Sequence, residues 1–107
     1  MTVHERLISA TTNAIDVFTE LYDQAVVSGG PKFTADGCSA LIDCAISKNR
    51  IMVVTLDHQP DEFMIALGNK NGADADIVHE ILPADQLNAS TLLKYMEDHF
   101  AKKPLLT

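Results

Sequence analysis

Basic residues are scarce in this sequence. Eight Lys and Arg stand against fifteen Asp and Glu, so the 107-residue chain has a net charge of 8 − 15 = −7. Proteins that bind duplex nucleic acid usually carry a basic stripe that neutralises phosphates, and anionic membranes attract the same sign of charge. The composition therefore disfavours nucleic acid and membrane as direct partners. An acidic surface favours a basic partner protein through electrostatic steering, although acidity also serves solubility alone.

Long apolar runs are also lacking. No stretch of 18 apolar residues is available to cross a bilayer, and Glu5 stands where a secretory signal would carry basic residues. We therefore expect an intracellular, cytoplasmic protein. The length and the hydrophobic fraction of 47% predict one domain, residues 1–107, with one core.

Motifs for catalysis or cofactor binding are missing. Cys38 and Cys44 are the only cysteines, and on a helix they would lie about 120° apart, which suits neither a local disulfide nor a zinc pair. They are expected to be buried, reduced thiols. The glycine spacing matches neither phosphate-binding fingerprint, and no serine stands in a strained glycine-flanked turn. We expect no cofactor and favour a protein without enzymatic activity.

Two short apolar segments are present and organise the prediction. Ile51–Leu56 and Phe63–Leu67 are rich in branched residues and flank the polar turn 58–62, which is typical of paired strands. In the first segment, side chains pointing to either face are apolar. Both faces of the sheet should therefore be covered.

The flanking segments complete the predicted fold. Apolar spacing predicts a long helix over Val3–Val27 and a second over 34–47. Alternation predicts a third strand over Ala75–Leu82, after the hairpin signal Asn71-Gly72, and Ser90 is predicted to cap a last helix from Thr91 to Lys102. The result is an α+β fold of order α-α-β-β-β-α, with helices packed on a three-stranded antiparallel meander.

A sheet with two apolar faces predicts self-association. The first and last helices can lie on one face, which leaves the other exposed, and monomers rarely expose a large apolar patch. A two-fold homodimer is one cover for that face. The second predicted helix is the alternative cover.

Two acidic groups are candidate partner-binding sites. Asp16, Glu20 and Asp23 recur at the spacing of one helix face, as an acidic ridge or an ordinary solvated side. Asp57, Asp61 and Glu62 lie in or beside the predicted turn. Either group is predicted to bind, and thereby inhibit or regulate, a basic partner protein.

The alternative function is binding of a small ligand or divalent cation, with or without hydrolysis. A meander brings Glu80 and Asp85 toward the turn that contains Asp57, His58 and Glu62. Carboxylates with an imidazole suit a divalent cation, and crowded carboxylates can supply a general acid or base. The candidate ligands are Asp57, His58, Glu62 and Glu80, although their spacing matches no metal motif. The histidine His4 is expected in a fraying first helical turn.

Overall fold

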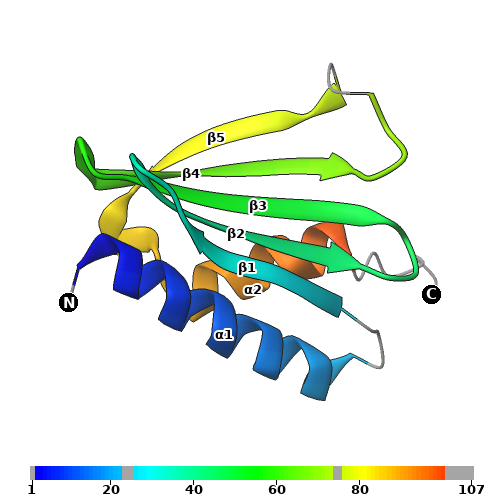
Figure 1. The fold of residues 1–107 in the computed structure, drawn as a ribbon. Helices are drawn as coiled ribbons and strands as arrows, with labels where there is room; N and C mark the ends of the chain where they lie inside the picture. The colour runs from blue at the N-terminus through cyan, green and yellow to red at the C-terminus, as the bar shows by residue number, and fades with distance from the viewer. Residues whose placement is uncertain (1, 23–25, 74–75, 101–107) are drawn as a thin grey trace.

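The computed structural model describes residues 2–22, 26–73 and 76–100, which form two helices, five strands and one 3-10 turn (Figure 1). The bounds are α1 Val3–Leu21, β1 Val26–Phe33, β2 Gly37–Cys44, β3 Asn49–Leu56, β4 Gln59–Asn69, β5 Val78–Pro83, η2 Ala84–Gln86 and α2 Ala89–His99. The α+β class is confirmed. The order α-α-β-β-β-α and the three-stranded sheet are wrong, because the chain forms five strands between its two helices.

The sheet is an antiparallel meander in the order β1-β2-β3-β4-β5. The predicted strands Ile51–Leu56 and Phe63–Leu67 lie within β3 and β4, as their apolar character indicates. The connecting turn is shorter than predicted, because Leu56 already pairs with Gln59. Asp57 and His58 alone make the turn, and residues 59–62 extend β4.

The helix predicted over 34–47 is absent, and β2 occupies that segment. The spacing of Cys38, Ile42 and Ala45 fits a helical stripe, but Cys38, Ala40, Ile42 and Cys44 also alternate. The structure follows the alternation, because β2 pairs with β1 on one side and β3 on the other. Long-range pairing therefore overrides the local helical pattern.

Helix α1 begins where its sequence provides a cap. The Thr2 side chain accepts from the Glu5 amide, and the Glu5 carboxylate accepts from the Thr2 amide, which is a capping box. The helix ends at Leu21 rather than at the predicted Val27, because Val26 and Val27 pair with β2. Residues 28–31, which follow that predicted end, lie in β1, where the register shifts between Gly29 and Lys32.

The last two elements are close to their predicted positions. Strand β5 spans Val78–Pro83, while residue 75 of the predicted strand lies outside the described residues. Asn71 and Gly72 belong to a longer loop rather than a two-residue hairpin. Helix α2 is capped by Asn88 rather than Ser90, and its predicted end, residues 101–102, is outside the described residues.

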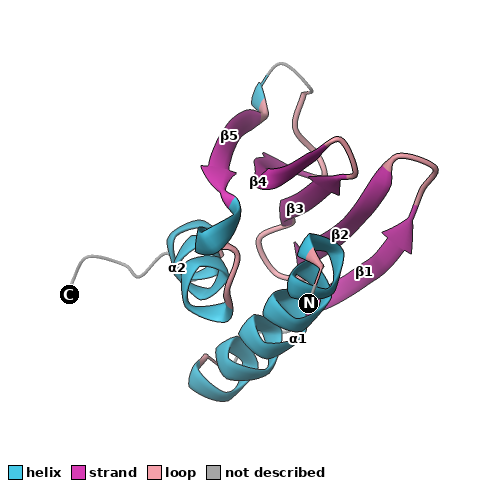
Figure 2. Cartoon of the chain, turned by 90° about the vertical axis from the view of Figure 1, so that its left-hand side faces the viewer, coloured by secondary structure: helices cyan, strands magenta, loops and turns pink. Residues whose placement is uncertain are grey.

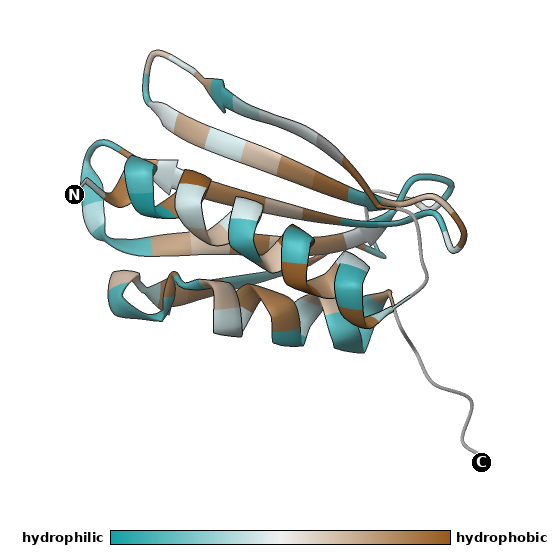
Figure 3. Cartoon of the chain, turned by 90° about the horizontal axis from the view of Figure 1, so that it is seen from below, coloured by the Kyte–Doolittle hydropathy of each residue, from teal (hydrophilic) through white to brown (hydrophobic). Residues whose placement is uncertain are grey.

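Both helices lie on one face of the sheet (Figures 2 and 3). We call this the covered face. It buries Phe18 of α1 and Met96 of α2 against the strand residues Cys38, Ala40, Ile42, Cys44, Ile51, Val53, Phe63 and Ile65. We call the opposite side the open face, and no helix of the described part of the chain packs on it. Neither described helix is long and apolar enough to cross a membrane.

Candidate functional site

The open face is apolar across its centre. Register and alternation place the following side chains on it: Leu41 of β2, Met52, Val54 and Leu56 of β3, Met64 and Ala66 of β4, and Ile81 of β5. Ala66 is 4% exposed, yet it is not part of the core cluster, because its open-face neighbours shield it. Ile81 is 64% exposed on the edge strand. These residues form an apolar surface over four strands, on which Ser39 lies beside Val54 and His79 lies beside Ala66.

Two hollows flank this apolar centre. One, of about 80 Å³, lies near the β3–β4 turn and is lined by Val54, Leu56, Met64 and Ile81, with Glu62 at its side. The other, of about 180 Å³, lies at the opposite end of the strands and has a lining that includes Met52, Ala66, Arg50, Lys70 and His79. The open face is therefore apolar in the middle and charged at its two ends.

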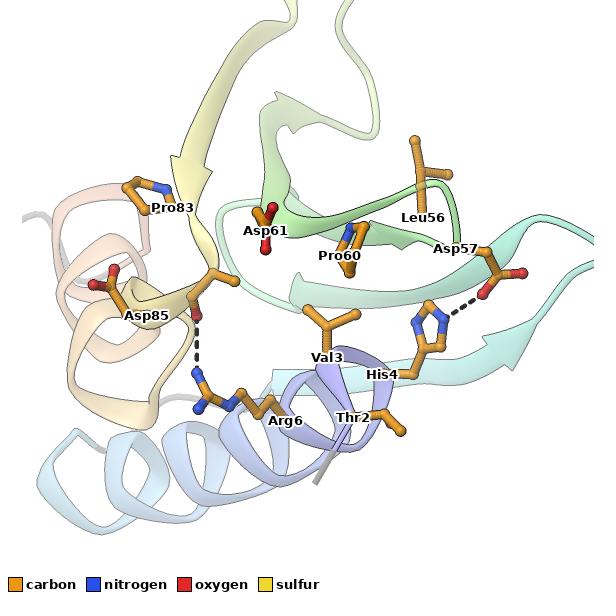
Figure 4. A pocket seen from close by; sticks show the side chains of 11 residues that line it. Thr2, Val3, His4, Arg6, Leu56, Asp57, Pro60, Asp61, Pro83 and Asp85 are labelled. Carbon is orange, nitrogen blue, oxygen red and sulfur yellow. Dashed lines mark hydrogen bonds and ion pairs between the residues drawn. The ribbon is translucent and has the colours of Figure 1, made fainter.

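A larger pocket lies at the end of the molecule formed by the β3–β4 turn, the start of α1 and η2 (Figure 4). Its volume is about 800 Å³, and its apolar lining comes from Val3, Leu56, Pro60, Pro83 and Ala84. Its charged lining consists of Asp57, Asp61, Asp85, His4 and Arg6. We call this the acidic-end pocket, because three carboxylates face one guanidinium and one imidazole.

The side chains of Arg6 and His4 in this pocket are held by neighbouring groups. Arg6 Nη1 donates to the Ala84 carbonyl oxygen at 3.3 Å, which links α1 to η2. The His4 ring lies between two residues of the β3 end, with Nε2 2.6 Å from Asp57 Oδ1 and Nδ1 2.7 Å from Thr55 Oγ1. Thr55 is fully buried, so His4 joins the surface turn to the covered face. The start of α1 is therefore bonded to the sheet rather than frayed.

The predicted acidic group is brought together only in part. Asp57, Asp61 and Asp85 line one pocket, as the meander prediction implied, while His58 is exposed in the turn. Glu62 lies on the open face, whereas Glu80 pairs in register with Ile65 and accepts a hydrogen bond from Tyr95 of α2. The sheet therefore separates Glu62 from Glu80. Among residues 2–22, 26–73 and 76–100, no three His, Cys, Asp or Glu side chains lie close enough to hold a metal ion.

The other predicted residues lie elsewhere. Asp16 and Glu20 are exposed on α1, and Asp23 lies outside the described residues, so the acidic ridge is described only in part. Cys38 and Cys44 are free and buried, as predicted, but they lie on β2 rather than on a helix. Burial raises the pKa of the Cys38 thiol, which favours its protonated, less reactive form.

The bonds of His4 are not apparent in the sequence. Thr55 and Asp57 are 51 and 53 residues away from it, so no local pattern reveals those contacts. The capping box formed by Thr2 and Glu5 was a usable signal, because it indicates a well-formed helix start.

Comparisons of this chain with protein-family models, with curated proteins and with solved structures give no match. The open face and the acidic-end pocket are therefore the features of this molecule that point to a function.

Proposed function

We propose that this protein is a small, non-catalytic protein-interaction module that acts as a homodimer and binds a basic partner protein, which it inhibits or regulates. The observation that carries the proposal is the position of both helices on one sheet face, with an apolar surface on the other. Contiguous apolar patches of this kind on soluble proteins usually mark interaction sites. A second copy is the simplest cover, since two-fold homodimers are the commonest oligomers.

A charged side chain in the centre of the open face tests the homodimer. Val54 lies in the middle of that face, so Val54→Lys places an ammonium group where a second copy would have to bury it. We expect the dissociation constant, measured by sedimentation velocity, to rise by about a hundredfold or more. Val17→Lys on α1 is the matched control, because Val17 is 38% exposed outside the open face. A wild-type chain that stays monomeric at high concentration contradicts the homodimer.

The acidic-end pocket supports the basic-partner part of the proposal. Its three carboxylates outnumber the single guanidinium of Arg6, and apolar side chains around them can contact the aliphatic part of a Lys or Arg side chain. The overall charge of −7 also steers a basic surface toward this protein. This pocket is built from three separate parts of the chain, whereas Asp16 and Glu20 lie together on an exposed helix face.

Replacing carboxylates of the acidic-end pocket with neutral amides tests whether this pocket binds a basic partner. We expect Asp61→Asn combined with Asp85→Asn to weaken binding of a fluorescent arginine-rich peptide by about tenfold at low ionic strength, measured by fluorescence anisotropy. Asp16→Asn combined with Glu20→Gln removes the same charge from α1 and serves as the control. Equal losses in the two double variants would show that total charge, rather than the pocket, attracts the peptide.

A further inference from the structure

The two ends of the sheet carry opposite net charge. Counted over the strands and their connecting turns, the end with the β3–β4 turn has four described acidic residues and one basic residue, a balance of 1 − 4 = −3, from Asp36, Asp57, Asp61, Glu62 and Lys32. Counted in the same way, and only over the residues that the structure describes, the end with the β2–β3 turn has three basic and two acidic residues, a balance of 3 − 2 = +1, from Lys48, Arg50, Lys70, Asp43 and Asp76. We call these the acidic end and the basic end.

The charged ends must take part if a second copy covers the open face. With strands about 4.8 Å apart, five strands are roughly 24 Å wide, and eight-residue strands are roughly 27 Å long at about 3.4 Å per residue. The whole face therefore presents about 650 Å² in projection, which is close to the ~800 Å² that each partner contributes to a stable interface. The apolar centre alone is smaller than that. A stable dimer must therefore extend to the ends of the strands.

Two-fold symmetry allows two ways to stack one open face on another. If the axis runs along the strands, each acidic end lies over the partner's acidic end, and like charges oppose each other. If the axis runs across the strands, each acidic end lies over the partner's basic end, and each strand crosses its own symmetry mate. Opposite charges across an interface favour the correct arrangement, and like charges disfavour the other.

We infer that two copies stack open face to open face with their acidic and basic ends exchanged, so that Glu62 of each copy lies opposite Lys70 of the other. This inference rests on the proposed homodimer and adds its geometry. Ala66 of β4 suits the crossing point, because its small side chain lets the two strands approach each other. Glu62 precedes Ala66 by four residues and Lys70 follows it by four, so both lie about 13 Å from the crossing point.

Lys70 is a better test residue than its neighbour Arg50. The Arg50 guanidinium already donates to both Asp43 oxygens, with Nε 2.7 Å from Oδ1 and Nη2 3.1 Å from Oδ2. Lys70 is exposed in the turn after β4 and lines the hollow at the basic end. Its charge can be reversed without breaking the Arg50–Asp43 pair.

A charge-exchange experiment tests the inference. Glu62→Lys alone and Lys70→Glu alone each place like charges at both symmetric contacts, so we expect each variant to raise the dissociation constant about tenfold in sedimentation velocity at low ionic strength. An equimolar mixture of the two variants restores unlike charges at both contacts. We therefore expect heterodimers in the mixture to bind about as tightly as the wild type, as should the double variant that carries both changes.

The controls separate a specific contact from a change in total charge. Glu20→Lys and Lys94→Glu make the same charge changes on exposed positions of the helix layer, and we expect their mixture to show no such recovery. Two weakened variants that do not recover on mixing would overturn the end-exchanged arrangement while leaving the homodimer in place. A monomeric wild type would remove the homodimer and this arrangement together. Circular dichroism of each variant verifies that the exposed substitutions leave the fold intact.

Discussion

The two faces of one sheet differ in what covers them, although the same strands build both. On β2, Ile42 is fully buried beneath the helices, while its neighbour Leu41 points to the open face and remains half-exposed. Both side chains are large and aliphatic. The difference between them therefore comes from the position of the two helices rather than from hydrophobicity. A sheet that is apolar on both sides, with helices on one, retains one surface suited to a partner.

The covered face is also bonded to its helices by polar groups. At the acidic end, His4 joins α1 to Thr55 and Asp57 of the sheet. At the other side of the layer, Tyr95 of α2 donates to Glu80 of β5, and Asn49 Nδ2 donates to the His99 carbonyl oxygen at 2.6 Å. These bonds position both helices over the same face. On the described part of the open face there is one ion pair between side chains, that of Arg50 with Asp43, and it lies close to the basic end.

The largest expected difference between the faces is in stability. We expect Ile42→Ala to lower the free energy of unfolding by about 2–5 kcal/mol, because it removes fully buried methyl groups and leaves a cavity. Leu41→Ala removes the same kind of group from the open face, and we expect it to cost less than about 1 kcal/mol in the monomer. Urea unfolding of both variants measures the difference.

Repeating both unfolding measurements at several protein concentrations tests whether a second copy covers the open face. If a second copy covers the open face, the loss caused by Leu41→Ala grows as concentration rises, since the dimer adds stability by mass action. The loss caused by Ile42→Ala has no such origin and should change less. Equal losses for the two variants in dilute solution would contradict the distinction between a covered and an open face.

Local patterns in the sequence correctly predicted some of the helices and strands. The apolar segments within β3 and β4 and a helix near each end of the described chain were recognised from composition and spacing, whereas the cap of α1 at Thr2 was missed and that of α2 was assigned to Ser90 instead of Asn88. The segment 34–47 was not, because apolar residues on both of its faces satisfy a helical and an alternating pattern at once. In the structure, neighbours on both sides make β2 a central strand. That pairing joins residues that no local window contains.

The candidate sites show the same limit. Grouping Asp57 with Asp61 and Asp85 required only the order of the elements, and the structure places all three around one pocket. Separating Glu62 from Glu80 required the register of β4 and β5, which sets the side of the sheet on which each residue lies. The turn signal Asn71-Gly72 did not determine this register, because β4 ends at Asn69 and β5 begins only at Val78, so the two strands are not joined by a two-residue hairpin.

The smallest expected effect concerns the edge of the covered face, at Tyr95. Its hydrogen bond to the Glu80 carboxylate raises the pKa of Tyr95 from 10.0 to about 12. The folded state therefore retains the phenol proton at a pH where the unfolded chain releases it. This stability is fully present below about pH 10 and is lost as pH rises toward about 12.

We expect Tyr95→Phe to lower the free energy of unfolding by about 1 kcal/mol near neutral pH, and we expect the difference in this free energy between the variant and the wild type to shrink between about pH 10 and 12. Urea unfolding at several pH values measures that difference, and Glu80→Gln is the companion variant, since it removes the charge that holds the proton. A difference that stays constant up to about pH 12 would show that the bond between α2 and β5 contributes nothing to holding the helix over the covered face.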